Sequence, residues 1–543
     1  MRSCSTPFDS LPFSKLFQEY TRNPDSLQSF FDGNPWNEND LETRAGEFRF
    51  VGDRQASVHA LRAFNRSLGM SGKGLKQIDR LKDPNALAVV TGQQLTLYGG
   101  PLFTVYKTLT AILYARRWEQ KLNRPVIPVF WLADEDHDFD EAIELGLLHQ
   151  DRWVPLKMES ESGGGPVGRD RLGPEFKSFE AEFFDLLPVS DFTPHVRELL
   201  QKTYHDQANF REAFAGLLLH LFEREGLVLA GSDDPAIKAL TAGPMQTSAA
   251  HPDDVVRSLE KQSTALEKQG YGRQALVQTS NIFYLDPENG RQKLRLAENA
   301  WSNGNGRCWN TDELLGEIEA HPERFSPNVF LRPLMQDRLL PTLAYVCGPG
   351  ELAYYAQMKD LYRLAGQRMP MLLPRFSATL IEPAIDRVVG ELPFELTEYV
   401  QRPEDLESQF VRQNCQYEIE TLFESWREEI RSGSEDRMKW IENVDPTLKA
   451  SADKVITHAL NEVTDLEERT WRAVKKQQSI SIERIHRIRE HLFPSGKPQE
   501  RQLSMIYYMN RYGTDLWRRL LLWMEDEENH PTLESDRHHW IYL

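Results

Sequence analysis

Residues 89–141 have the sequence VVTGQQLTLYGGPLFTVYKTLTAILYARRWEQKLNRPVIPVFWLADEDHDFDE, and the order of its parts decides the fold. The apolar runs at residues 87–91 and 125–133 have the length and continuity of buried parallel strands. Between them, apolar residues recur at the three- and four-residue steps of one helix face: Leu102, Val105, Tyr106, Leu109, Ile112 and Leu113. This strand-helix-strand unit predicts an α/β fold in which the two strands are parallel neighbours.

Polar residues gather at the ends of these two strands. Thr91, Gly92, Gln93 and Gln94 close the first strand, and Asp134–Asp138 follow the second. In an open parallel sheet, ligands bind at the edge formed by the carboxyl ends of the strands. The sequence therefore places the candidate functional site at this edge.

Two further strands are predicted farther along the chain. Residues 227–230 form a short apolar run that ends in Gly231–Pro235. Residues 342–347 form another, which leads through the loop Gly348–Glu351 into a predicted helix at residues 352–364. The second of these units repeats the arrangement of the first, so the sheet is predicted to be interrupted and then rejoined.

The intervening stretches predict two insertions. Gly163–Pro166 marks an exposed loop in the first, and residues 270–295 are typical of strands with a hairpin turn at Asp286–Gly290 in the second. The predicted segments are an N-terminal helical and aromatic segment packed on the core (1–85), a first core part (86–150), a first insertion (151–220), a second core part (221–255), a β-rich insertion (256–328), a third core part (329–385) and a C-terminal helical coiled-coil arm (386–543).

The C-terminal part is rich in Glu, Arg, Lys and Gln and carries a seam typical of coiled coils. The seam residues recur at steps of three and four: Leu448, Ala452, Val455, Ala459, Val463, Leu466 and Thr470. Pro446 and Pro494 bracket the long helix. The pattern favours an antiparallel arm that mediates dimerisation, and the alternative is a helical bundle packed on the core.

Composition narrows the class of protein. A chain of 543 residues suggests about two to four domains. The 64 Lys and Arg residues are outnumbered by 82 Asp and Glu, and the net charge of -18 does not favour nucleic acid as a partner. Residues 1–15 lack the features of a signal peptide, and no segment approaches ~18 uninterrupted apolar residues, so we expect a cytoplasmic protein without a membrane partner. The four cysteines are far apart and are expected to be reduced thiols: Cys4, Cys308, Cys347 and Cys415.

The turn Gly99-Gly100-Pro101 admits two interpretations. The glycines permit close backbone approach and the proline suits the first helical position, so free amides at the helix N-terminus could bind a phosphate. Alternatively, the glycines serve only a strand-to-helix turn, because the stretch matches neither GxxxxGK[ST] nor a clean GxGxxG. Lys107 lies about 9 Å farther along the helix, at ~1.5 Å per residue, and is predicted to be a surface lysine.

The acidic loop after the second strand carries the candidate catalytic residues. His137 lies between carboxylates directly after a buried strand, which suits general base chemistry or the positioning of Mg²⁺. His137 and Asp136 are the first candidates, and Glu135 and Asp140 follow. No second His or Cys lies at ligand spacing from His137, so no protein-bound metal ion is predicted. The alternative is a solvated acidic loop.

Other residues could line the same edge. Gly348 and Gly350 repeat the anion-binding pattern at another strand end, while Glu351 could equally complement the dipole of the helix that follows. Three residues just ahead of that strand could line the cleft, although salt bridging is their commoner role: Arg332, Gln336 and Asp337.

Taken together, these motifs resemble the family of bacillithiol-biosynthesis cysteine-adding ligases. The resemblance rests on TGQQ, GGPL, YK and PVFWLADEDHDFDE within residues 90–141, followed by LRPLMQD, LLPTLAYVCGPGELAYYAQ and MPMLLPRFSATLIE. One departure is Asp134, where the family often has glycine. The resemblance implies a Rossmann-like core related to class I aminoacyl-tRNA synthetases, with two connecting insertions and a C-terminal coiled coil that forms a homodimer.

The resemblance also implies an activity. Cysteine would be joined through its carboxyl group to the amine of glucosaminyl malate, which is the last step of bacillithiol biosynthesis. Because such a condensation needs an activated carboxylate, ATP is the expected energy source, with Mg²⁺ and helix N-termini stabilising phosphate charge. A base such as His137 would accept a proton, and the intermediate could be an adenylate or an acyl phosphate.

Two rival classes are compatible with the same sequence. A nucleotidyltransferase-like ligase that activates a different carboxylate would keep the same loops, and it would show pyrophosphate exchange with an acid other than cysteine. A non-catalytic coiled-coil scaffold would keep the helical arm, but the polar loops at several strand ends argue against it.

Overall fold

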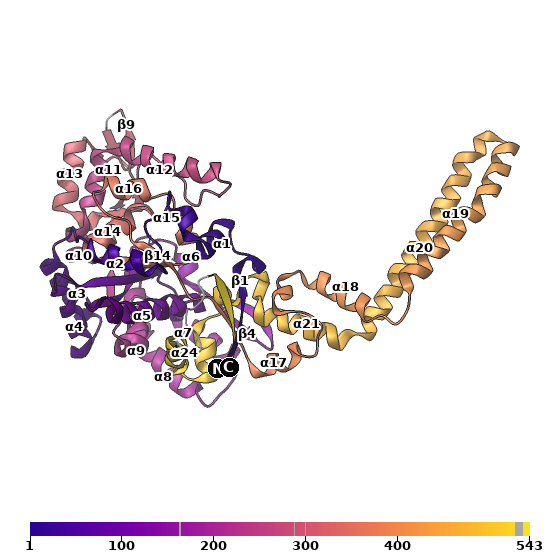
Figure 1. Cartoon of the computed structure of the whole chain (residues 1–543), viewed down its shortest axis with the longest axis horizontal. Coiled ribbons are helices and arrows are strands. Elements are labelled where there is room, and N and C mark those ends of the chain that lie inside the picture. The colour runs from indigo at the N-terminus through magenta and orange to yellow at the C-terminus, as the bar shows by residue number, and fades with distance from the viewer. Residues whose placement is uncertain (162–163, 287, 299, 527–535) are drawn as a thin grey trace. The chain divides into compact units, whose positions relative to one another are not determined.

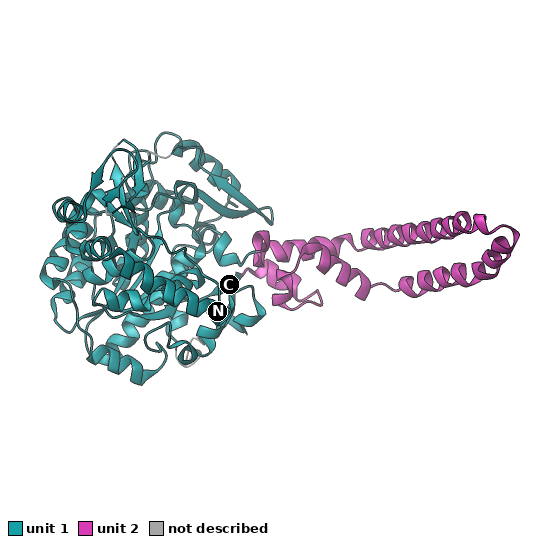
Figure 2. Ribbon diagram, turned by 90° about the horizontal axis from the view of Figure 1, so that it is seen from above, with its two compact units in different colours: residues 1–380, 497–543 teal, residues 381–496 magenta. Residues whose placement is uncertain are grey.

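A computed structural model gives the fold and describes residues 1–161, 164–286, 288–298, 300–526 and 536–543 (Figure 1). The chain forms two compact units (Figure 2). The first unit comprises residues 1–380 and 497–543, and the second comprises residues 381–496. Gly163 of the predicted loop and Pro287 of the predicted hairpin turn lie outside the described residues.

The first unit is built on a parallel sheet with the strand order β14-β13-β2-β3-β6. Strands β2 (Leu87–Gln94) and β3 (Val126–Ala133) pair along their whole length, from Leu87 opposite Val126 to Gln94 opposite Ala133. This pairing confirms the predicted α/β fold and its two parallel neighbours. Strand β2 runs past the predicted end at Thr91, because β3 continues beside it and pairs with each residue of the polar stretch.

The order of the strands reverses between β2 and β13. Strand β6 (Val228–Gly231) follows β3 on one side, whereas β13 (Thr342–Cys347) and β14 (Met371–Pro374) lie on the other side of β2. In doubly wound sheets, this switch point is where the crevice for a ligand opens at the carboxyl ends. Helix α5 (Leu102–Leu122) connects β2 to β3 and is buried along most of its length.

The second insertion is mixed rather than β-rich. Its predicted hairpin is present as β7 (Ile282–Asp286) and β8 (Gly290–Lys293), which pair antiparallel. Helices α12 (Pro252–Lys268) and α13 (Thr311–Ala320) flank the hairpin. The strand prediction overlooked a helix-starting signal, since Asn310 and Glu313 form a capping box at the start of α13.

The first insertion begins earlier than residue 151. Strand β4 (Glu144–His149), which the sequence placed in the first core part, pairs antiparallel with β5 (Arg152–Lys157) of the insertion. Three helices follow: α7 (Phe176–Leu186), α8 (Thr193–Thr203) and α9 (Phe210–Phe222).

The helix predicted at residues 352–364 is divided into α15 (Pro349–Tyr355) and α16 (Lys359–Leu364). Helix α15 begins inside the predicted loop Gly348–Glu351. It does so because the Glu351 carboxylate accepts a hydrogen bond from the Gly348 amide at 2.8 Å and caps the first turn.

The two chain ends meet in the first unit. Strand β1 (Arg2–Pro7) pairs antiparallel with β16 (Arg537–Tyr542), and Trp540 and Ile541 of β16 are buried. Residues 497–543 therefore belong to this unit, whereas the sequence placed them in the helical arm. The local apolar pattern of helices α23 (Met505–Tyr512) and α24 (Leu516–Glu525) does not reveal which unit they join.

The second unit is helical. After α17 (Pro383–Val389) and α18 (Pro403–Gln413), helices α19 (Ile419–Val444) and α20 (Lys449–Gln477) form a long pair joined by a short turn. Helix α21 (Ser479–Leu492) completes the unit. This arrangement confirms the predicted coiled-coil arm.

The predicted seam combines residues from two different faces of α20 and of the turn that precedes it. Val463 is buried, and Ala452, Ala459 and Thr470 are partly covered. By contrast, Leu448, Val455 and Leu466 are 43%, 66% and 43% exposed. The steps of seven and eleven between these three residues keep them together on one exposed face, since an α-helix has ~3.6 residues per turn.

In the part of the chain that the structure describes, no helix is both long and apolar enough to cross a membrane.

Candidate functional site

Asp134, at the end of β3, is turned into the protein. Its carboxylate is fully buried and lies 2.5 Å from Arg211 Nε, and it accepts hydrogen bonds at 2.8 Å from Ser232 Oγ and from the Asp233 amide. Burial raises the pKa of Asp134, and Arg211 opposes that shift. Asp134 therefore ties the end of β3 to the end of β6 and does not face a ligand.

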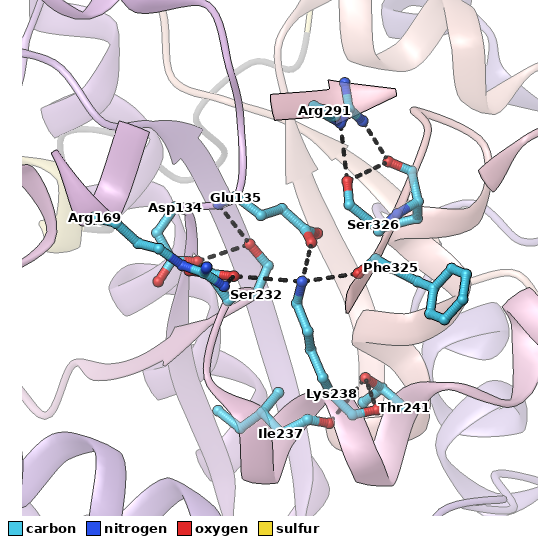
Figure 3. A network of polar contacts seen from close by, with 12 residues as sticks. Asp134, Glu135, Arg169, Ser232, Ile237, Lys238, Thr241, Arg291, Phe325 and Ser326 are labelled. Atoms are coloured by element: carbon cyan, nitrogen blue, oxygen red, sulfur yellow. Dashed lines mark hydrogen bonds and ion pairs between the residues drawn. The ribbon is translucent and has the colours of Figure 1, made fainter. Parts of the chain in front are cut away.

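Glu135 forms a buried pair with Lys238 of α10 (Pro235–Thr241). Lys238 Nζ lies 3.2 Å from Glu135 Oε2 and donates to the Phe325 carbonyl oxygen at 2.9 Å, as Figure 3 shows. Burial raises the pKa of Glu135 to about 7, although Lys238 acts in the opposite direction. Glu135 can therefore gain or lose a proton near neutral pH.

The carboxylate of Asp233, in the loop after β6, is surrounded by cations. Arg169 donates to both of its oxygens at 2.6 and 2.7 Å, and Arg211 Nη2 donates at 3.0 Å. Lys238 Nζ lies 3.4 Å away. These contacts join the loop after β6 to two parts of the first insertion, the segment that carries Arg169 and helix α9, and to Lys238 of α10.

Asp136 is an anchored carboxylate. Gln94 Nε2 donates to its Oδ2 at 2.6 Å, and the amide of His137 donates to its Oδ1 at 2.7 Å. Although burial would raise the pKa of Asp136, hydrogen bonds keep it below its usual range. Asp136 therefore remains ionised and joins the end of β2 to the acidic loop.

Two groups contact the Nδ1 atom of His137. Arg291 Nη1 lies 2.9 Å from it, and Asp136 Oδ1 lies 3.3 Å from it. Because a guanidinium can only donate, the tautomer that accepts from Arg291 carries its proton on Nε2.

A cavity of about 570 Å³ opens beside these residues. Its lining comes from the end of β2, the acidic loop and the first insertion: Gln94, Asp136, His137, Asp138, Phe139, Asp140, Ser160 and Glu161. Asp140 lines this cavity, but its carboxylate is 84% exposed and pairs with Lys157 Nζ at 2.6 Å. Asp140 is thus separated from the buried part of the site.

A second polar cluster lies at the switch point between β2 and β13. The three protons of Lys107 Nζ meet Gly92 O at 2.9 Å, Gln93 Oε1 at 3.0 Å and Glu351 Oε2 at 2.5 Å. Lys107 is 3% exposed, so the prediction of a surface lysine was wrong. The Lys107 side chain turns back from α5 toward the end of β2. The distance along the helix axis does not show this, because it locates only the backbone of Lys107.

Glu351 is the centre of this cluster. It also accepts a hydrogen bond from Tyr345 Oη at 2.7 Å. Burial would raise the pKa of Glu351, but Lys107 and the Gly348 amide keep it below its usual value. Gly350, one residue earlier, is exposed and does not contribute to this cluster.

Arg332, Gln336 and Asp337 brace α14 (Leu331–Leu339) from inside the protein. Arg332 Nη2 donates to Tyr354 Oη at 2.9 Å, and Gln336 is fully buried. Asp337 accepts from Tyr362 Oη at 2.7 Å, and burial raises its pKa to about 6. Gln336 and Asp337 do not reach the cavity beside His137, and Arg332 lies closer to the switch point, over the Tyr345 ring.

The amides of the Gly99-Gly100-Pro101 turn are used within the protein. The Gly99 amide donates to Tyr204 Oη at 3.2 Å, that of Gly100 to Leu97 O at 3.0 Å, and that of Leu102 to Leu503 O at 2.9 Å. These contacts match the interpretation of a strand-to-helix turn, and they occupy donors that a phosphate would need.

Thr91 and Gly92 serve the sheet itself. Thr91 Oγ1 donates to Val346 O at 3.1 Å across the switch point. A Cβ atom at Gly92 would lie 2.8 Å from Trp131 O, so a side chain there would push β2 from β3. Both residues therefore fix the strand ends on which Gln93 and Gln94 stand.

Sequence reasoning missed the basic half of the site. Its four cations lie in the first insertion, the second core part and the second insertion, about thirty to one hundred and fifty positions after the acidic loop. They are Arg169, Arg211, Lys238 and Arg291. Each stands in a stretch without a recognisable motif, and its role depends on the tertiary fold. The turn before β8 predicts the strand that carries Arg291 but not the direction of the side chain.

Among the described residues, no group of three or more His, Cys, Asp or Glu side chains is arranged to hold a metal ion. The buried carboxylates of Asp134, Glu135 and Asp233 are engaged by arginine and lysine, so they do not fit a magnesium site.

Two domain models of a single protein family together match nearly all of this chain. Residues 1–376 match the N-terminal Rossmann-like domain of bacillithiol biosynthesis BshC, and residues 378–530 match its C-terminal coiled-coil domain. A protein of Salinibacter ruber named "Putative cysteine ligase BshC" is 34% identical over 510 residues, covering 93% of each chain. Proteins of the same name from Chlorobaculum tepidum and Shouchella clausii are 32% and 31% identical, covering 85% and 94% of this chain and 85% and 96% of their own.

Proposed function

The chain belongs to the bacillithiol biosynthesis BshC family, and from this membership we propose that it is a ligase that joins cysteine to glucosaminyl malate. The carboxyl group of cysteine would form an amide with the sugar amine in the last step of bacillithiol synthesis. The observation that carries the proposal is the position of Glu135 and His137 at the carboxyl edge of the Rossmann-like sheet, where His137 lines the cavity and Glu135 is buried two residues before it.

Amide formation needs an amine that has lost its extra proton. A sugar ammonium group bound at this edge would transfer a proton to a nearby base before or during attack on the activated carboxyl group. Glu135 is suited to this role because burial raises its pKa to about 7. His137 could accept the proton only after Arg291 leaves its Nδ1.

The cysteine carboxylate must also be activated, and we propose ATP as the energy source. A free carboxylate resists attack by an amine, whereas a mixed anhydride with phosphate does not. The turn at Gly99–Pro101 offers no open amide at Gly99 or Gly100, so we assign the nucleotide to no residue there. We expect Mg²⁺ to enter with the nucleotide phosphates, and the reaction to take place in the cytoplasm, where ATP is available.

The reaction can be tested directly. Purified protein is incubated with cysteine, glucosaminyl malate and Mg-ATP, each omitted in turn, and the products are followed by mass spectrometry. The expected result is a cysteinyl amide that requires all three, together with AMP or ADP, which identifies the activated intermediate. If the substrates bind and no amide forms, the proposed reaction is wrong.

We further propose that two copies of the chain associate through the second unit. Helix α19 exposes four apolar side chains that form two pairs. The two members of each pair are eighteen residues apart in the sequence, and they lie on the same face because five helical turns take about eighteen residues. They are Leu422, Trp426, Trp440 and Val444, with 64%, 41%, 68% and 62% of each exposed. Exposed tryptophans in such a row favour a partner surface over permanent contact with water.

A further inference from the structure

Of the four cations in the basic half of the site, Arg291 alone forms no ion pair with a carboxylate of the described residues. Arg169 pairs with Asp233, Arg211 with Asp134, and Lys238 with Glu135. Arg291 contacts only neutral acceptors among the described residues. Its Nε donates to Ser326 Oγ at 3.0 Å, its Nη2 to Pro327 O at 2.8 Å and its Nη1 to His137 Nδ1 at 2.9 Å.

The nearest carboxylates are committed elsewhere. Glu135 and Asp136 act on the charge of Arg291, but Glu135 is paired with Lys238, and Asp136 is held by Gln94 and by the backbone of its own loop. The guanidinium is half-buried and stacks 3.6 Å from the centre of the Phe283 ring. Burial lowers the pKa of Arg291, as expected for a charge that water and anions do not fully stabilise.

The geometry leaves Arg291 able to bind an anion. A guanidinium has five N–H donors in a planar fork, and three of them are used here. A carboxylate could take the remaining donors in the paired arrangement that arginine favours. The ring bonded to Arg291 is that of His137, which lines the cavity. An anion on Arg291 would therefore lie at the edge of the proposed reaction site.

We propose that Arg291 binds a carboxylate that the amine-bearing substrate carries but does not use in the reaction. This inference rests on the proposed function, because it assigns recognition of the malate group to the second insertion, through β8. Because Nη1 carries a second proton beside the one directed at His137 Nδ1, the bound carboxylate would lie next to the imidazole ring.

The test compares Arg291→Gln with Arg295→Gln. Arg295 is an exposed arginine of the same insertion, so its substitution removes the same charge without touching the site. The KM of glucosaminyl malate, cysteine and ATP is measured for each protein. We expect Arg291→Gln to raise the KM of glucosaminyl malate by roughly 10- to 100-fold, the usual value of a charged hydrogen bond, and to change the other two by less than about twofold. Arg295→Gln should behave as the native chain.

A neutral substrate sharpens the comparison. The methyl glycoside of glucosamine has the same sugar amine but no malate carboxylates. The native enzyme should prefer glucosaminyl malate to this analogue, and Arg291→Gln should lose that preference. Arg291→Lys, which keeps the charge but not the fork, should restore part of it. An increase in the KM of cysteine or ATP instead, or an unchanged preference, would overturn the proposal.

A binding measurement separates this proposal from the proposed reaction. Free malate is titrated into native protein, Arg291→Gln and Arg295→Gln by calorimetry, with circular dichroism and thermal unfolding to establish that all three are folded. Malate should bind to the native protein and to Arg295→Gln, and at least 10-fold more weakly to Arg291→Gln. Equal binding to all three contradicts the role of Arg291. If malate binding depends on Arg291 while no acceptor is converted to an amide, the proposed reaction fails and the binding site stands.

Discussion

Lys107 Nζ and Glu351 Oε2 lie 2.5 Å apart at the point where the strand order of the sheet reverses. The pair joins α5 to the start of α15 and has little contact with water, with 4% and 19% of the two side chains exposed. Lys107 also donates to Gln93 Oε1, so the side-chain amide of Gln93 points its oxygen toward Lys107 and its nitrogen away from Lys107. The pair therefore sets both the spacing of β2 and β13 and the polarity that Gln93 presents.

Removing one charge of this pair should cost more than removing both. Lys107→Met leaves Glu351 buried without its cation, and such a loss costs about 3–5 kcal/mol of folding free energy. Glu351→Gln does the same to Lys107. We expect the double variant to be more stable than either single variant, as measured by thermal unfolding of all four proteins. Strictly additive losses would mean that the two side chains are not coupled.

Glu135→Gln should remove the proposed base. The rate of ligation should fall by about 100-fold or more, which is the usual contribution of general base catalysis. In the native enzyme, the base must be deprotonated, so kcat/KM should decrease as the pH falls below the Glu135 pKa of about 7. The Glu135→Gln variant should lose this pH dependence.

Glu144→Gln, which alters an exposed carboxylate close by in sequence, is the control. If His137→Gln abolishes the pH dependence and Glu135→Gln retains it, His137 is the base.

The sequence carried enough information to predict four of the five strands of the sheet, without β14, and only the acidic half of the polar residues at its edge. Continuous apolar runs predicted β2, β3 and β13 because buried parallel strands leave a local signature. The acidic residues were found because they directly follow those strands. Their partners Arg211 and Lys238 could not be found in this way, since a helix surface gives no sign of which distant loop it will meet. Lys107 shows the same limit within a single strand-helix-strand unit.

Gly100→Ala tests whether the glycine turn is structural. Gly100 has φ 74° and ψ -157°, which is a region that only glycine populates readily, and a Cβ atom there would meet Thr96 Oγ1. We expect a loss of about 1–3 kcal/mol of stability. The KM of ATP should not change in the folded fraction. Gly350→Ala, where a Cβ has no neighbour closer than 3.9 Å, should unfold as the native protein does. A raised KM of ATP with unchanged stability would support the phosphate-binding interpretation instead.

His538 should make the first unit sensitive to acid. It is buried between Ser377 Oγ and Thr379 Oγ1, each 2.9 Å from a ring nitrogen, and burial lowers its pKa to about 4. Between that value and the ordinary value of about 6.5, the unfolded chain binds a proton that the folded chain does not. Stability is therefore lost as the pH falls through this range, by about 3 kcal/mol at most. The fall in Tm from pH 7 to pH 4.5 should be smaller for His538→Gln, and an equal fall would exclude this histidine as a cause.

Substitution of the exposed apolar row should separate the two copies of the proposed dimer. Trp440 and Val444 are 68% and 62% exposed in one chain, so replacing both with glutamate removes little packing within that chain. In a dimer, each glutamate would place a charge in an apolar interface, and we expect association to weaken by at least roughly 30-fold.

Light scattering after size-exclusion chromatography measures the mass, and thermal unfolding should be unchanged at concentrations where both proteins are monomers. Lys476→Glu, at an exposed polar position of the neighbouring helix α20, is the control. A native protein that is monomeric at all concentrations would contradict the proposed dimer, and a dimer that survives the double substitution would place the interface elsewhere.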